Sequence, residues 1–258
     1  MQNRKVDTHL DDRGVFTITL NDPEKRNALS AALTAELVAA MDEADTNDAV
    51  RVVVITNTGH VFCAGADLSE RTSDDRQTDL VDPLTIFSRI QSSPKPWVGR
   101  IAGHAVAGGT GLAAALDISV ARDDAKFGFT EVRIGVAPAI ISVICLPKMR
   151  RGEATQVFLR GQRFDGTEAA RLGLITKAVT ADEIDAEVAA VVDDLLLGGP
   201  KALAAAKDVI SRVSELPASE AFSWAAARSA ELFQSEEAAE GMRAYLEKRP
   251  PRWAPKAD

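Results

Sequence analysis

The sequence has few of the residues that mark disulfide-rich, metal-binding or membrane-spanning proteins. It holds two cysteines, Cys63 and Cys145, and its three histidines are not spaced with Cys, Asp or Glu as metal ligands are. We therefore expect no disulfide framework, no metal site and a reducing, cytoplasmic environment. The longest apolar run, residues 136–147, is shorter than the about 18 residues that a membrane-spanning helix needs. Residues 1–14 are polar, so we expect no secretory signal peptide there.

Basic residues are also in deficit, because 30 Lys and Arg stand against 38 Asp and Glu, for a net charge of −8. Such a chain is a poor general binder of nucleic acid or of an anionic membrane, and we expect neither as a partner. Two local basic groups remain. Lys25 and Arg26 form one, and Lys248, Arg249 and Arg252 form the other; each is either solvated surface or a spot that holds an anionic ligand.

What is present is the composition of an ordinary globular domain, with 46% hydrophobic and 26% charged residues. Short β-branched segments alternate with helical patterns, which predicts an α/β fold with a mainly parallel sheet. The elements that we predict from these patterns are a hairpin over 5–20, strands over 51–56, 95–103, 118–122 and 174–179, and helices over 29–44, 83–91 and 112–117.

The last quarter of the chain has the spacing of helices only. We predict helices over residues 181–197, 200–213, 218–233 and 235–248. The boundary that we favour lies at residues 197–200, where glycines end one helix and a proline begins the next. It divides a core, residues 1–197, from a C-terminal helical segment, residues 198–258. The apolar side chains of this segment pack either on a partner subunit or on the chain's own core.

Residues 103–117 contain four glycines directly before a helical pattern. They do not form a phosphate-binding P-loop, because no Gly-Lys-Ser/Thr closes the loop, and they lack the spacing of a dinucleotide fingerprint. Two interpretations stay open. Glycine permits tight packing of a strand against a helix, and it also lets a ligand oxygen approach the free N–H groups at a helix N-terminus. Such a site stabilises an anion that forms during a reaction.

A second turn of small residues follows the buried strand over residues 51–56. Ala64, Gly65 and Ala66 stand where the chain leaves the edge of the sheet. Ligands of open α/β sheets bind at such edges. This turn therefore offers the second N–H donor that an anion site needs.

The chain resembles the enoyl-CoA hydratase/isomerase (crotonase) family over nearly its whole length. The resemblance rests on the order and spacing of five segments: LNDPEKRNALS (20–30), FCAGADLSE (62–70), GHAVAGGTGLAAALDISVAR (103–122), AKFGFTEVRIGVAP (125–138) and EGMRAYLEKRPP (240–251). It implies a spiral of ββα repeats and a C-terminal helical segment used for trimerisation, so that we expect a homotrimer or a hexamer made of two trimers. It also implies a coenzyme A thioester as the substrate, with no separate cofactor.

The resemblance assigns roles to residues at the two small-residue turns. The backbone N–H groups of Ala66 and Gly108 would form the oxyanion hole for the thioester oxygen. Residues of the first turn would line the path of the adenine and pantetheine groups, and two basic residues would lie near the phosphates. These expected coenzyme A-binding residues are Ala64, Ala66, Asp67, Leu68, Lys25 and Arg26, together with Gly108.

The chain departs from the family at one of two catalytic glutamates. The second is present as Glu131, which we expect to be the catalytic base, but the first is replaced by Gly111, which has no side chain and leaves this position vacant. The segment after Pro138 is apolar and branched, so we expect a hydrophobic acyl pocket. One carboxylate can still add water to a conjugated enoyl thioester, which is the reaction that we favour. It can also isomerise the double bond of an enoyl thioester. The third hypothesis is a catalytically weak acyl-CoA-binding protein. Some members of the family with glycine at this position look like hydratases of branched substrates, and the segment EVRIGVAPAIIS (131–142) resembles that branch.

Four other residues near these motifs have structural interpretations. We expect His104 to be packed or hydrogen-bonded and Cys63 to be a packing residue, because no histidine base can be assigned to it. Asp117 should fix a helix end. Asp67 either contacts the ligand or caps the turn that follows it.

Overall fold

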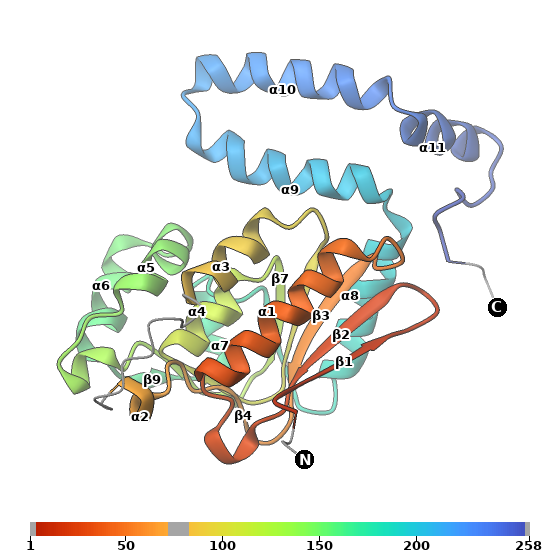
Figure 1. The fold of residues 1–258 in the computed structure, drawn as a ribbon. Helices are drawn as coiled ribbons and strands as arrows, with labels where there is room; N and C mark the ends of the chain where they lie inside the picture. Colours follow the sequence, from red (N-terminus) through yellow and green to blue (C-terminus); the bar gives the residue numbers. More distant parts are fainter. Residues whose placement is uncertain (1–3, 72–82, 256–258) are drawn as a thin grey trace.

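A sheet in which six described strands take the order β1-β2-β3-β5-β7-β10 forms the centre of the structure (Figure 1). The computed structural model describes residues 4–71 and 83–255. The first two strands form an antiparallel hairpin and the other neighbours pair in parallel, which confirms the predicted hairpin and the mainly parallel sheet. The strands are β1 (Val6–Leu10), β2 (Val15–Leu20), β3 (Val52–Asn57), β5 (Trp97–Ile101), β7 (Ile118–Arg122) and β10 (Lys177–Val179).

A second, smaller sheet has the order β4-β6-β8-β9 within the described residues. In three successive units of the chain, a strand of the large sheet is followed by a short strand of the small sheet and then by a helix, which is the expected ββα repeat. The first three strands of the small sheet run parallel and the last is antiparallel to its neighbour. Its strands are β4 (Val61–Cys63), β6 (His104–Val106), β8 (Phe127–Gly128) and β9 (Arg163–Phe164).

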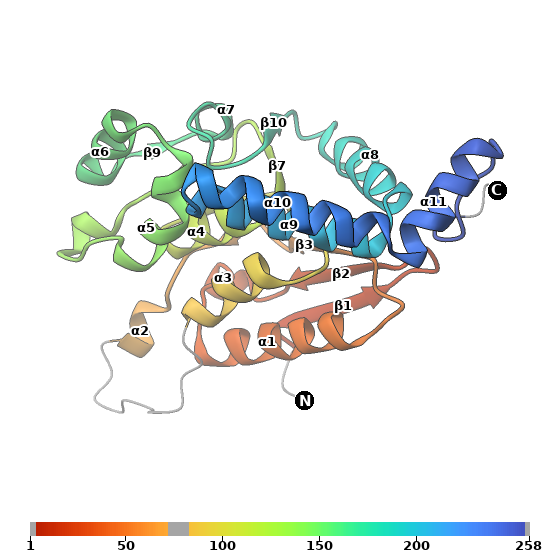
Figure 2. The ribbon, with the colours of Figure 1, turned by 90° about the horizontal axis from the view of Figure 1, so that it is seen from above.

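The large sheet is buried on both faces, as the continuous apolar run of β3 predicts. Alternate residues of this strand enter different cores: Val53 and Ile55 belong to the larger core, whereas Val52 and Val54 pack with α8 (Ile184–Leu197). Figure 2 shows α8 on one side of the sheet and α1 and α3 on the other. The helices that contribute to the larger core include α1 (Ala31–Thr46), α3 (Pro83–Ser92) and α4 (Gly108–Ala115).

Helix α1 begins where a serine caps it. The Ser30 side chain accepts a hydrogen bond from the Leu33 N–H, which satisfies one of the free amides of the first turn. Leu33, Leu37 and Met41 are buried along one stripe, as their spacing predicts. Leu29, the first residue of the predicted helix, is buried but precedes the observed one.

Several elements differ from the sequence predictions. Helix α4 begins at Gly108, four residues before the predicted start at 112, and the strand predicted over 174–179 is limited to β10. The apolar segment after Pro138 forms a helix. In the part of the chain that the structure describes, the helices without a sequence prediction are α2 (Leu68–Arg71), α5 (Ala139–Cys145), α6 (Arg151–Arg160) and α7 (Gly166–Arg171). Three short 3-10 helices there cover Pro23–Lys25, Glu131–Ile134 and Leu146–Lys148.

The C-terminal helices form an arm beside the core (Figure 1). They are α9 (Pro200–Glu215), α10 (Ala218–Phe233) and α11 (Glu236–Leu246). Lys207 of α9 joins the arm to the core: its Nζ donates to a carboxylate oxygen of Asp117 at 2.6 Å and to the carbonyl oxygens of Ile90 and Lys95. No helix in the described residues is long and apolar enough to cross a membrane.

Candidate active site

The carboxyl ends of β4, β6 and β8 lie side by side, because these strands are parallel neighbours in the small sheet. Ala64 follows β4, Ala107 follows β6, and Glu131 lies three residues after the end of β8. Parallel strands place the loops after their carboxyl ends at one edge, which is where open sheets bind ligands. The topology therefore gathers the predicted site residues from segments that are far apart in the sequence.

One cavity of about 840 Å³ at this edge contains every residue that the sequence analysis assigned to the site. Loop residues after β4 and β6 line one part of it, and the segment from Thr130 to Ile141 lines another. The predicted residues that line the cavity are Lys25, Arg26, Ala64, Ala66, Asp67, Leu68, Gly108 and Glu131.

The two small-residue turns touch through their backbones. A Cβ atom at Gly65 would lie 2.9 Å from the Gly108 nitrogen, and one at Gly108 would lie 3.2 Å from the Gly65 Cα and 3.7 Å from the Ala66 nitrogen. Gly65 also has φ = +84°, which side chains disfavour. Within the described residues, no hydrogen bond uses the backbone N–H of Ala66 or of Gly108. Two neighbouring N–H donors are thus free at the cavity.

The residue before Gly108 has an unfavourable backbone conformation. Ala107 has φ = +52° and ψ = −124°, a region that residues other than glycine rarely adopt. A buried threonine, which the sequence analysis missed, holds the surrounding segments together: Thr110 Oγ1 donates to the Ala105 carbonyl oxygen at 2.7 Å and accepts from the Gly128 N–H at 3.2 Å. The signal for it was a hydroxyl among glycines and alanines in a helix that is buried nearly throughout.

Glu131 is a half-buried carboxyl group at the start of a 3-10 helix. Its Oε2 atom is fully buried and has no hydrogen-bond partner among the described residues. Burial raises its pKa above the ordinary value of 4.5, because the charged form loses solvation; the hydrogen bond from its own backbone N–H opposes this shift. A carboxylate in this state is a proton acceptor with an unused lone pair.

A second part of the cavity, which Lys25 and Asp67 line, is charged. Lys25 Nζ pairs with an oxygen of Asp67 at 3.0 Å, and the other oxygen of Asp67 accepts from the N–H and the hydroxyl of Ser69. These hydrogen bonds from Ser69, followed by the Lys25 ammonium, lower the pKa of Asp67. Both roles left open for this aspartate are therefore compatible with its place, since it caps the turn and also lines the cavity.

The space that a side chain at position 111 would take is filled by a neighbour. A Cβ atom there would overlap the side chain of Ile141, which packs onto α4 from α5. Ile141 and the adjacent Ile140 both line the cavity, together with Phe87 of α3. This part of the cavity is apolar, as the branched segment after Pro138 predicts.

The remaining residues near the motifs have structural partners. Cys63 is fully buried and burial raises its pKa to about 12, so it remains a neutral thiol that packs in the core. His104 accepts a hydrogen bond from the Lys126 N–H through Nδ1. Asp117 accepts from the Trp97 N–H at 2.7 Å and fixes the chain directly after α4. The structural interpretations of these three residues are confirmed.

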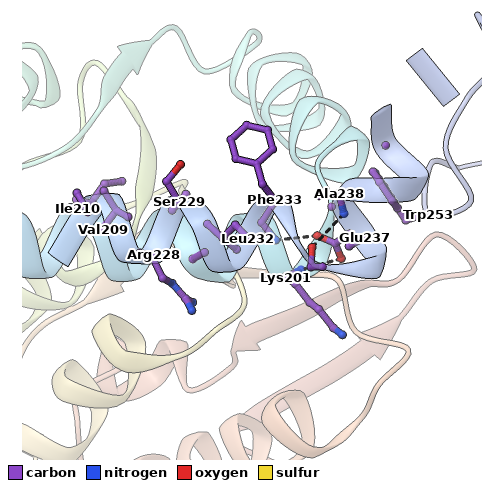
Figure 3. Close-up of a pocket in the computed structure, with 17 residues that line it drawn as sticks. Lys201, Val209, Ile210, Arg228, Ser229, Leu232, Phe233, Glu237, Ala238 and Trp253 are labelled. Atoms are coloured by element: carbon purple, nitrogen blue, oxygen red, sulfur yellow. Dashed lines mark hydrogen bonds between the residues drawn. The ribbon is translucent and has the colours of Figure 1, made fainter. Parts of the chain in front are cut away.

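A second hollow, of about 720 Å³, lies between α9, α10 and α11 and holds none of the predicted site residues. Figure 3 shows Val209 and Ile210 at one end of it and Glu237 and Trp253 at the other. Glu237 accepts hydrogen bonds from the backbone N–H groups of Lys201 and Ala202, which caps α9. The other lining side chains are mostly apolar.

Comparisons with known proteins show the family of the chain. The family model described as Enoyl-CoA hydratase/isomerase matches residues 11–256. A Thermus thermophilus relative that carries an enoyl-CoA hydratase name is 34% identical over 245 residues, covering 93% of this chain and 97% of the relative. The 2,3-dehydroadipyl-CoA hydratase of Escherichia coli is 30% identical over 243 residues, covering 92% and 94%.

Solved structures of enoyl-CoA hydratases are similar to this fold. A crystal structure of an enoyl-CoA hydratase from Mycobacterium smegmatis superposes with a TM-score of 0.90 at 32% identity, covering 97% of this chain and 99% of the other. The protein has the α/β fold of the crotonase-like enzymes, with C-terminal helices. The chain belongs to the enoyl-CoA hydratase/isomerase family.

The burial of Glu131 predicts how the unfolding free energy of the protein depends on pH. Since its pKa is higher in the folded protein than in the unfolded chain, the stability that this group contributes is present below about pH 4.5 and is lost as the pH rises through the folded-state pKa. Glu131→Gln cannot ionise, so its unfolding free energy, relative to that of the wild type, should increase between about pH 4 and pH 7. Urea unfolding at both pH values measures this difference. Glu43→Gln, on the exposed side of α1, is the control for the removal of one carboxylate from the chain. A constant difference for Glu131→Gln would contradict the prediction.

Proposed function

We propose that the protein is an enoyl-CoA hydratase that adds water to the double bond of a 2-enoyl-CoA thioester with one glutamate. The thioester oxygen accepts hydrogen bonds from the N–H groups of Ala66 and Gly108, which stabilises the enolate. Glu131 takes a proton from water as the hydroxyl adds to carbon 3, and it then returns the proton to carbon 2. The observation that carries this proposal is the unpaired Oε2 of Glu131 in the same cavity as two free N–H donors.

The charged part of the cavity suits the coenzyme A half of such a substrate. Lys25 and Arg26 line it, and the N–H of Ala64 donates to the carbonyl oxygen of Arg26, which joins the two loops. We assign the phosphates of coenzyme A to these two cations and the acyl group to the apolar side near Ile141. Ala64, Asp67 and Leu68 then line the path between them. Coenzyme A enters as part of the substrate, and the proposed reaction needs no further cofactor.

Isomerisation of the double bond is the second candidate function. Glu131 would move a proton from carbon 2 to carbon 4 of a 3-enoyl thioester and no water would be consumed. The packing of Ile141 against Gly111 favours this candidate, because no second carboxylate can hold a water there. An assay that follows the absorbance of the conjugated thioester separates the two reactions, since hydration of a 2-enoyl-CoA lowers it and isomerisation of a 3-enoyl-CoA raises it.

Removal of the proposed base tests the function directly. Glu131→Gln keeps the shape of the side chain but cannot transfer the proton, so kcat on the preferred enoyl-CoA should fall by about 10²–10⁴-fold. Binding of coenzyme A should change little, because the carboxyl group lies on the acyl side. Steady-state kinetics and calorimetry measure both, with Glu43→Gln as the control. A folded Glu131→Gln protein with the wild-type rate would rule out the mechanism, and tight thioester binding without turnover by the wild type would favour a binding protein.

The two N–H donors can be blocked through Gly108. In Gly108→Ala the new methyl group would lie 3.7 Å from the Ala66 nitrogen and would press on Gly65, so it would cover the place where an oxygen meets both donors. Loss of an oxyanion donor costs on the order of 10²–10³-fold in kcat. The matched control is Gly152→Ala in α6, where a Cβ atom meets nothing within 4 Å. Equal turnover by the two variants would show that the oxygen binds elsewhere.

We also propose that residues 198–258 assemble the chain into a homotrimer or into a dimer of trimers. The arm exposes large apolar side chains, among them Ile210, Phe222, Phe233 and Tyr245. Exposed apolar surface of this kind marks protein–protein contacts. The hollow between α9, α10 and α11 lies on the same segment.

Light scattering on the purified protein at micromolar concentration tests this assembly and should give the mass of three or six chains. Phe233→Asp should reduce the mass, because it places a charge in the proposed contact. Leu159→Asp, an equally exposed apolar residue on α6, should leave it unchanged. A monomeric wild type, or dissociation by the Leu159 variant alone, would refute the assignment.

A further inference from the structure

Two residues interlock where α5 packs on α4. The side chain of Ile141, which is 3% exposed, occupies the space next to Gly111. A Cβ atom at Gly111 would lie 2.8 Å from the Ile141 Cβ and 3.7 Å from the Phe87 ring. Both elements can approach this closely only because residue 111 has no side chain.

The interlocked pair lies next to the free N–H donors. Gly108 and Gly111 are three residues apart in α4, so they lie on the same side of the helix, about one turn or 5 Å apart. Ile141 and Phe87 cover Gly111 and also line the cavity. The wall that Ile141 and Phe87 form therefore lies about one helical turn from the N–H group that would meet a thioester oxygen.

We propose that Ile141 is a specificity-determining residue that restricts the acyl group to chains without a branch at carbon 2. This inference rests on the proposed function for one point only, the place of the thioester oxygen. A substituent on carbon 2 would have to displace the Ile141 side chain. That side chain cannot move toward α4, because the Gly111 backbone is already in contact with it.

The expected size of the effect follows from the chemistry of apolar pockets. One methyl group is discriminated by about 10–200-fold when a pocket is closely packed around the ligand. Shortening Ile141 to alanine removes the wall and leaves Phe87 as its remaining part. The preference for unbranched acyl groups should then decrease by at least about tenfold.

Binding of saturated thioesters tests this inference without any turnover. The dissociation constants of butyryl-CoA and 2-methylbutyryl-CoA are measured by calorimetry on the full chain. The wild type should bind the unbranched thioester more tightly, Ile141→Ala should reduce the ratio, and Ile141→Val should reduce it less. Val143→Ala, an exposed position of the same helix that does not line the cavity, is the matched control and should keep the wild-type ratio.

The possible outcomes separate the inference from the function on which it rests. If neither thioester binds, both the proposed function and this inference are wrong. If both bind and the ratio in Ile141→Ala equals that of the wild type, only the inference is wrong. Thermal unfolding adds a second readout, since Gly111→Ala should lower the melting temperature in the wild type and lower it less in Ile141→Ala. An equal effect in the two backgrounds would show that the residues do not interlock.

Discussion

The contact between Gly65 and Gly108 is the constraint on which the rest of the site depends. Each of these glycines stands in the loop that follows a parallel strand, and the two backbones meet with no room for a side chain. The N–H groups of Ala66 and Gly108 stand beside this contact and line the cavity without partners among the described residues. The unfavourable φ of Ala107 costs about 1–3 kcal/mol. The core must offset this cost, and the hydrogen bonds of Thr110 join β6, β8 and α4 at the place where it arises.

The cavity has two chemically different parts, and the fold explains why. Its charged part comes from loops at the surface, where the exposed Lys25 pairs with Asp67. Its apolar part is built by α3 and α5, which pack Phe87 and Ile141 against α4. Glu131 belongs to the second part, and the loss of water around it raises its pKa. A raised pKa makes this carboxylate a stronger proton acceptor than an exposed glutamate.

The sequence predicts the site better than it predicts the surrounding packing. Glycines before a helix, small residues after a buried strand and Glu131 all have local signals, and the structure brings them into one cavity. The small sheet has no such signal, because β8 and β9 are too short for a periodic pattern. Gly108 and Gly109 are poor helix formers, so the early start of α4 is set by tertiary contacts. Ile141 fills the space beside Gly111 because α5 packs on α4. No spacing of residues in the sequence encodes that contact.

The gathering of the site from distant segments also bears on how the chain folds. Lys25, Ala66, Gly108 and Glu131 come together only when three strands of the small sheet have paired, and these strands belong to three successive ββα units. Local helices form within about a microsecond, whereas contacts between residues far apart in the chain must wait for loop closure. During refolding the two free N–H groups and the carboxyl group therefore acquire their arrangement after the local helices have formed. Helix content would then return ahead of the cavity, and ligand binding would mark the completion of the chain fold.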